Sequence, residues 1–97
     1  MSIIYERAKN EKMKITSVGT NAINICDEAG RTYVLNETAT YVYKLLNTPL
    51  VLDGIVRLCE GKELLIGAST RNLEKEIIDV LGQLLYIKII TRKIVNP

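Results

Sequence analysis

Hydrophobic and polar residues alternate in three short stretches of the first third of the chain. These stretches are MKITSV (13–18), AINIC (22–26) and RTYVL (31–35). Alternation over so few residues is typical of strands that bury one face. The turn-forming segments VGTN and DEAG separate them, and Gly30 at the end of the second turn suits a positive φ. The pattern therefore predicts an antiparallel meander of three strands.

The spacing of apolar residues changes to a helical period after residue 36. Asn36 occupies the N-cap position, and Glu37 stands in the first turn, where a negative charge suits the helix dipole. The buried face of this helix is predicted to hold Ala39, Val42, Tyr43 and Leu46. Pro49 opens a second helical stretch that Gly61 ends, with a buried face made of Leu52, Ile55, Val56 and Cys59. An apolar connector, KELLIGAS (62–69), follows.

The third predicted helix begins near Thr70 or Asn72, ends near Leu85 or Tyr86, and has an unusually wide apolar face. Its core stripe spans about 60° and contains Leu73, Ile77, Val80 and Leu84. A second stripe widens the apolar arc to about 160°, with Glu74 among its members Ile78, Leu81 and Leu85. Such a helix is deeply buried, packs against a second copy of the chain, or faces a ligand, and periodicity alone does not choose.

The two ends of the chain leave alternatives open. SIIY (2–5) fits a short strand or a loosely ordered N-terminus over residues 1–11, and IKIITRKIV (87–95) fits a further strand or a packed tail. We predict one α+β domain over residues 12–90, with residues 91–97 as a C-terminal tail. Its expected fold is winged helix-turn-helix-like, with a three-stranded antiparallel sheet followed by three helices.

Composition and charge exclude several classes of protein. A chain of 97 residues that is 47% hydrophobic forms one small globular domain. The net charge of +2 is too small to indicate a polyanionic partner. Apolar runs are too short to span a membrane, and the N-terminus carries charges where a signal peptide is apolar. We expect a cytoplasmic protein with no membrane partner.

Groups that could perform catalysis are scarce. The chain has no His, none of the common nucleotide-binding or hydrolase motifs, and only two widely separated cysteines, Cys26 and Cys59. Its carboxylates are scattered, and pairs such as Glu60 with Glu63 fit solvated surfaces better than acid/base pairs. We therefore predict no catalytic residues, no metal site and no cofactor: the protein is not an enzyme.

Three kinds of binding protein remain. A winged-helix nucleic-acid binder would place its third helix in the major groove, but residues 73–85 carry Glu74, Glu76 and Asp79 against Lys75, a net charge of −2. We therefore expect no nucleic-acid partner, and keep this class as an alternative. A structural homodimer module that pairs through the third helix is the second alternative.

Binding of an extended peptide is the interpretation that we favour. A strand at a sheet edge has unpaired backbone groups that an added strand can satisfy. Residues 31–35 would be that edge if the second stripe of the third helix lies beside it. Ile78, Leu81 and Leu85 would then form the other wall of a groove.

Two segments of the sequence resemble the PqqD-like family, the leader-peptide recognition elements of pathways for ribosomally made, post-translationally modified peptides. The segments are DEAGRTYVLNETATYVYKLL (27–46) and EIIDVLGQLLYIKII (76–90). Matching features are a hairpin turn ending in Gly30, the Tyr33-x-Leu35-Asn36 strand end, the Thr38-Ala39 helix start and the Leu45-Leu46 finish. The resemblance covers residues 12–90. The chain departs from the family in its long apolar connector and in Lys88, which stands where a Gly often ends the last helix.

The resemblance implies a specific function and site. Family members are winged-helix domains that bind the leader of a precursor peptide as an added strand, between the third strand and the third helix. By position, the implied peptide-binding residues are Arg31, Thr32, Tyr33, Val34, Leu35, Ile78, Leu81 and Leu85, with Glu74 placed to meet a basic or polar leader residue. The implied protein is a stand-alone, non-catalytic adaptor that presents the peptide to a separate modifying enzyme, as in pyrroloquinoline quinone and lasso-peptide pathways.

Overall fold

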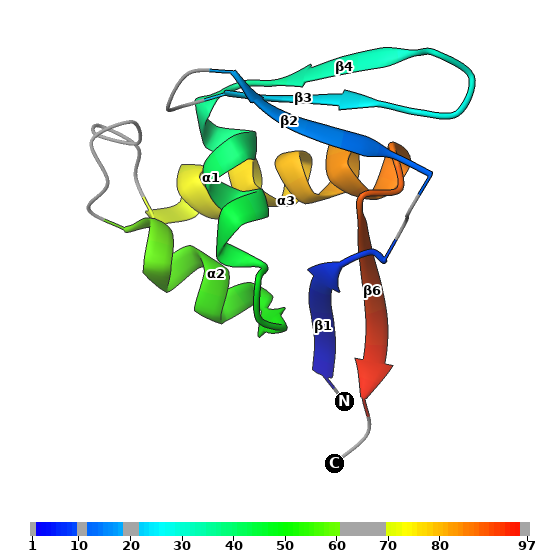
Figure 1. Ribbon diagram of the computed structural model, residues 1–97. Coiled ribbons are helices and arrows are strands. Elements are labelled where there is room, and N and C mark those ends of the chain that lie inside the picture. Colours follow the sequence, from blue (N-terminus) through cyan, green and yellow to red (C-terminus); the bar gives the residue numbers. More distant parts are fainter. Residues whose placement is uncertain (1, 10–11, 19–21, 61–69, 96–97) are drawn as a thin grey trace.

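The computed structural model describes residues 2–9, 12–18, 22–60 and 70–95. Its fold is α+β, with a three-stranded antiparallel sheet lying over three helices (Figure 1). The sheet has the order β2-β3-β4, with strands β2 (Lys14–Val18), β3 (Ala22–Cys26) and β4 (Thr32–Leu35). The helices are α1 (Glu37–Leu45), α2 (Leu52–Cys59) and α3 (Thr70–Tyr86). The predicted meander and the three helices are thereby confirmed.

The inner face of this sheet packs on the helices through aliphatic side chains. The register places Ile23 opposite Leu35 and Ile25 opposite Tyr33. Ile23, Ile25 and Leu35 are buried, as expected for the inward positions of alternating strands. They join one core with the buried residues of α1, α2 and α3.

Helix α1 begins where the sequence predicts, because its cap forms. The Asn36 side-chain oxygen accepts a hydrogen bond from the Ala39 backbone N–H at 2.8 Å. The Thr40 hydroxyl donates to the Leu35 carbonyl at 3.4 Å, which ties the first turn to the end of β4. Ala39, Val42 and Tyr43 are buried, so this face of the helix points inward as predicted.

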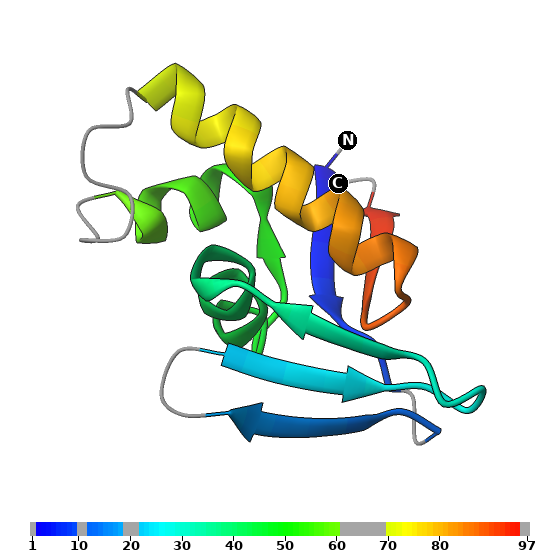
Figure 2. The ribbon, with the colours of Figure 1, turned by 90° about the horizontal axis from the view of Figure 1, so that it is seen from above.

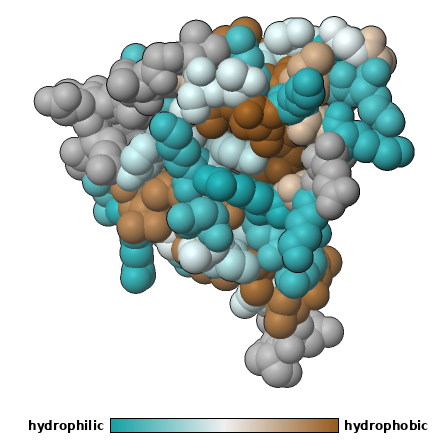
Figure 3. All heavy atoms as spheres, viewed as in Figure 1, coloured by the Kyte–Doolittle hydropathy of each residue, from teal (hydrophilic) through white to brown (hydrophobic). Residues whose placement is uncertain are grey.

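The ends of the chain form a second antiparallel sheet. Its order is β5-β1-β6, with strands β1 (Ser2–Arg7), β5 (Leu50–Val51) and β6 (Ile90–Val95). Residues 91–95, which the sequence left between a strand and a tail, thus belong to β6, which pairs with β1 from Ser2↔Val95 to Arg7↔Ile90. This β1–β6 ribbon leaves the body of the protein (Figure 1), and hydrophobic side chains lie at its free end (Figure 3), where Ile3 and Ile94 are exposed.

Helix α2 starts later than Pro49 suggests. Leu50 and Val51 pair with Tyr5 and Ile4 as strand β5, so the helix begins at Leu52. It ends at Cys59, where the Glu60 N–H donates to the Val56 carbonyl at 3.1 Å. The predicted stop at Gly61 and the connector at 62–69 lie outside the described residues.

Helix α3 buries its predicted core stripe and part of the second stripe. Leu73, Ile77, Val80 and Leu84 are buried, and so is Leu81. No helix in the described part of the chain is long and apolar enough to span a membrane.

Candidate functional site

Strand β4 has an open edge that faces α3. In the order β2-β3-β4, β4 has β3 on one side, and no strand of the described residues pairs with its other side. Seen from above, β4 is the strand of this sheet nearest to α3 (Figure 2). The open edge therefore lies beside a helix rather than in bulk solvent.

The hydrogen-bond register identifies the backbone groups on this open edge. The Asp27 N–H donates to the Arg31 carbonyl at 3.0 Å, so this pair stands at a hydrogen-bonded position of the β3–β4 ladder. Such positions alternate along an antiparallel pair. Tyr33 and Leu35 then bond to β3, whereas Thr32 and Val34 direct their N–H and C=O groups away from it. An added strand would bond to Thr32 and Val34.

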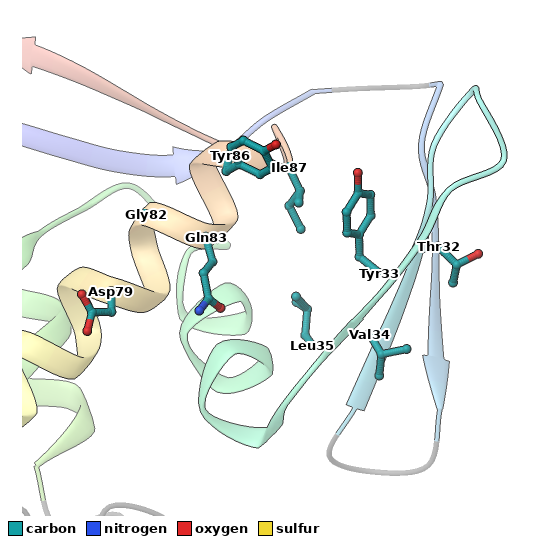
Figure 4. Close-up of a pocket in the computed structure, with 9 residues that line it drawn as sticks. All are labelled: Thr32, Tyr33, Val34, Leu35, Asp79, Gly82, Gln83, Tyr86 and Ile87. Atoms are coloured by element: carbon teal, nitrogen blue, oxygen red, sulfur yellow. The ribbon is translucent and has the colours of Figure 1, made fainter.

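Side chains of β4 form an apolar floor beside this edge. Tyr33 and Leu35 point toward α3, whereas Thr32 and Val34 point to the opposite side (Figure 4). Leu35 is buried and Tyr33 is half-buried, but Val34 is 68% exposed. Arg31, just before the strand, lies at its outer end.

The helical wall is formed by residues spaced one turn apart. Asp79, Gly82, Gln83 and Tyr86 follow the i, i+3, i+4, i+7 spacing of one helix face. With Ile87 and the four residues of β4 they line a cavity of about 690 Å³ (Figure 4), which we call the β4–α3 cleft. A Cβ atom added at Gly82 would meet no atom within 4 Å, so the cleft is open over this residue.

This wall is not the one that the sequence predicts. Leu81 is 1% exposed and belongs to the core, Leu85 is half-buried, Ile78 is 48% exposed, and Glu74 is exposed. None of these four residues lines the β4–α3 cleft. At 100° per residue they lie on one flank of the core stripe, whereas Asp79 and Gln83 lie on the other flank.

Two features of the sequence lie on the flank of α3 that lines the cleft. Gly82 interrupts a long helix at a position where no neighbouring atom requires a small residue. Tyr86 is a large aromatic residue on an otherwise polar stripe, and it is 82% exposed. The apolar stripe was the stronger pattern, but it serves mainly to bury α3.

The β4–α3 cleft continues into a smaller cavity past Tyr33, Tyr86 and Ile87, which line both. This second cavity has a volume of about 260 Å³ and is also lined by Met13, Asp27, Arg31 and Lys88. It lies at the β3–β4 turn, so the groove as a whole runs along β4 from Leu35 to Arg31.

Asp27 organises the turn at this end of the groove. Its side chain accepts hydrogen bonds from the N–H groups of Ala29 and Arg31, both at 2.9 Å, and from Arg31 Nε at 2.8 Å. Gly30 completes the turn with φ 82°. Desolvation acts to raise the pKa of Asp27, but the hydrogen bonds and charge of Arg31 together with the Ala29 N–H outweigh it, so the pKa lies below its usual value.

Neither a metal site nor a disulfide occurs in the described residues. No three side chains of His, Cys, Asp or Glu are grouped there to hold an ion. Cys59 is buried and Cys26 is half-buried, and they form no disulfide. What the cleft offers is backbone hydrogen-bonding groups, an apolar floor and charged groups at its ends.

These features define a small α+β domain with an open strand edge beside a helix. A solved structure of the same fold is that of TbiB1 in complex with the TbiA(beta) leader peptide. It aligns with a TM-score of 0.66 and 12% sequence identity over 94% of this chain and 99% of that chain. No protein-family model and no curated protein matches the sequence.

Proposed function

We propose that this protein binds the leader segment of a ribosomally made precursor peptide as an added strand on β4, in the β4–α3 cleft. The observation that carries the proposal is the open edge of β4, whose free backbone groups border an apolar cleft. Two further points support it: TbiB1, which shares the fold, was solved with a leader peptide, and residues 27–46 resemble PqqD-like proteins.

Strand addition divides affinity and selectivity between two kinds of contact. Backbone hydrogen bonds to Thr32 and Val34 each contribute about 1 kcal/mol and accept any residue except proline. Apolar peptide side chains over Tyr33, Leu35 and Ile87 contribute about 25 cal/mol per Å² buried and select for size and shape. Ordering a flexible leader offsets part of this gain, so we expect moderate affinity.

The role that follows is that of a non-catalytic adaptor of the PqqD-like type. Its partners are the leader peptide and a separate peptide-modifying enzyme. Holding the leader raises the effective concentration of the attached core peptide near that enzyme without changing the enzyme's chemistry.

Proline substitution tests strand addition directly. Val34→Pro removes one outward N–H but keeps the β3–β4 bonds of Tyr33 and Leu35, and edge strands tolerate proline at such positions. Because one hydrogen bond of about 1 kcal/mol is lost, we expect the dissociation constant for a candidate leader peptide, measured by fluorescence anisotropy, to rise about fivefold, with an unchanged circular dichroism spectrum.

The opposite edge of the same sheet supplies a matched control. The alternation that turns Val34 outward on β4 turns Ser17 outward on β2, because Thr16 stands opposite Asn24 in the β2–β3 ladder. Ser17→Pro should therefore leave leader affinity unchanged. Equal affinity of Val34→Pro and the wild type would contradict strand addition on β4.

Filling the cleft tests its helical wall. Gly82→Trp places an indole in the open space over residue 82, so we expect loss of leader binding in a folded protein. Ile78→Trp also introduces an indole into α3, but on the flank away from the cleft. This variant should bind the leader normally. The reverse result would move the site to the flank that the sequence favoured, and binding by both variants would contradict the β4–α3 cleft.

A further inference from the structure

Lys88 has an unusual backbone conformation at the end of α3. Its φ is 65°, and no other non-glycine residue in the described part of the chain has a positive φ. The Lys88 N–H donates to the Leu85 carbonyl at 3.1 Å and the Ile89 N–H to the Leu84 carbonyl at 3.2 Å. This is a Schellman motif, in which Lys88 occupies C′, the left-handed position just after the helix. Glycine adopts this conformation without strain, whereas lysine is strained in it. The dipole at the end of α3 favours a positive charge here, but it does not require that the lysine itself adopt the left-handed conformation.

The surroundings of Lys88 supply a second reason for a lysine at this position. Lys88 lines the second cavity together with Arg31, Tyr33 and Tyr86, and the two tyrosines also line the β4–α3 cleft. It also lines a third cavity, which shares Arg31 and Asp27 with the second and is lined in addition by Lys12 and Glu28. Lys88 therefore stands at the Arg31 end of the groove.

The charges of the described residues at this end do not balance. The described residues that line the second and third cavities include the cations Lys12, Arg31 and Lys88 and the anions Asp27 and Glu28. Two pairs form, Lys12 with Glu28 at 3.5 Å and Arg31 with Asp27 at 2.8 Å. Lys88 forms no ion pair with a described residue, so one positive charge remains. The cleft has the opposite charge at its other end, where Asp79 lies on the helical wall.

We propose that Lys88 is a specificity residue that binds the carboxylate of an Asp or Glu side chain in the peptide. This inference rests on the function proposed above and adds the chemistry of the ligand. An ammonium beside an already satisfied Asp27–Arg31 pair attracts an anion, and a bound carboxylate balances the local charge.

The register of β4 predicts where that acidic residue stands. Arg31, Tyr33 and Leu35 share one face of β4, and residues opposite each other in paired strands lie on the same face. Every second peptide side chain thus faces α3, with positions opposite Leu35, Tyr33 and Arg31. The first two of these meet the apolar floor, and the third lies beside Lys88. The expected pattern is two apolar residues and one acidic residue at alternate positions, with the acid at the Arg31 end.

A peptide selection tests this pattern. The probe is a phage library of random linear 12-residue peptides fused through their C-termini, so that no terminal carboxylate is free. Enrichment of sequences with an acidic residue two positions from an apolar residue supports the inference. Enriched sequences without that acid overturn it but leave the proposed function standing. Absence of any enriched sequence overturns both.

Variants of Lys88 then assign the contact. Lys88→Gly removes the ammonium and suits the positive φ, so the protein should stay folded with no fall in melting temperature. We expect the dissociation constant for the selected acidic peptide to rise three- to tenfold. The constant for its Glu→Gln (or Asp→Asn) form should not change. Lys88→Arg should retain the preference for the acid. Equal discrimination between the two peptides by the wild type and Lys88→Gly overturns the assignment.

Discussion

The guanidinium of Arg7 lies over the ring of Tyr43, 4.5 Å from the ring centroid. Arg7 Nε also donates to the Tyr43 carbonyl at 3.0 Å, and Arg7 Nη2 to the Lys44 carbonyl at 3.1 Å. These carbonyls belong to the last turn of α1, where the Leu46 N–H also donates to the Tyr43 carbonyl at 3.1 Å and the Asn47 N–H to the Lys44 carbonyl at 3.4 Å. The dipole of the helix attracts positive charge to this end. A residue of the β1–β6 ribbon therefore caps a helix of the main body.

Arg7→Ala should lower the free energy of unfolding by about 2 kcal/mol, because two charge-assisted hydrogen bonds and a cation–π contact are lost. Arg7→Lys keeps the charge but not the paired geometry, so its loss should be smaller. Urea denaturation measures both. An unchanged midpoint for Arg7→Ala would mean that the ribbon does not support α1.

Loss of the cap on α1 should have a similar but smaller effect. Asn36→Ala removes the acceptor of the Ala39 N–H and should cost about 1 kcal/mol. Asn36→Asp keeps an acceptor and should cost little. Asn47→Ala, an exposed asparagine just after α1, is the control and should leave thermal unfolding unchanged.

Gly82→Ala, a smaller change than Gly82→Trp, should affect stability and leader binding in opposite directions. Gly82→Ala should raise the free energy of unfolding by up to about 1 kcal/mol, since the added Cβ meets nothing and alanine favours the helix. Gly54→Ala in α2, where the Cβ would make ordinary contacts at 3.9 Å, should give a comparable gain. Leader affinity should fall with Gly82→Ala alone. A fall with Gly54→Ala too would show that stiffening, rather than blocking, weakens binding.

The Asp27 turn should make stability depend on pH in acid. The folded pKa of Asp27 is lowered below 3.8, so the unfolded chain binds the proton more readily than the folded one. The stabilisation is complete above about pH 5 and is lost as pH falls through the lower folded pKa. The difference in melting temperature between the wild type and Asp27→Asn should therefore be constant near neutrality and shrink in acid. A carboxyl NMR titration with an ordinary midpoint would contradict this.

Elements with a local pattern were predictable from the sequence. The strands at 13–18, 22–26 and 31–35, the Asn36 cap and the span of α3 all depend on residues a few positions apart. Leu73, Ile77, Val80 and Leu84 identified the buried face of α3 because that face is the most apolar. Strand β4, which lies at the edge of its sheet, followed from the same local alternation.

Features set by distant contacts were not predictable in this way. The flank of α3 that meets β4 depends on how the sheet packs on the helix. The helical pattern is equally compatible with β4 lying beside the flank of Ile78 or beside the flank of Gln83. By local pattern Leu50 and Val51 fit a first helical turn. In the structure they pair instead with Tyr5 and Ile4, which lie far away in the sequence. The positive φ of Lys88 could not be predicted; the sequence showed only a lysine at a position where a glycine often ends the last helix.

The pairing of Ser2 with Val95 has a consequence for the order of folding. This contact joins the two ends of the described chain, so forming it closes a loop that contains every other element. Closure of so long a loop is entropically unfavourable, and contacts between distant residues slow folding. The β1–β6 ribbon should therefore zip after the core has condensed. Linking the two ends covalently in a circular permutant would make the same pairs a local hairpin, and the permuted chain should fold faster to the same structure.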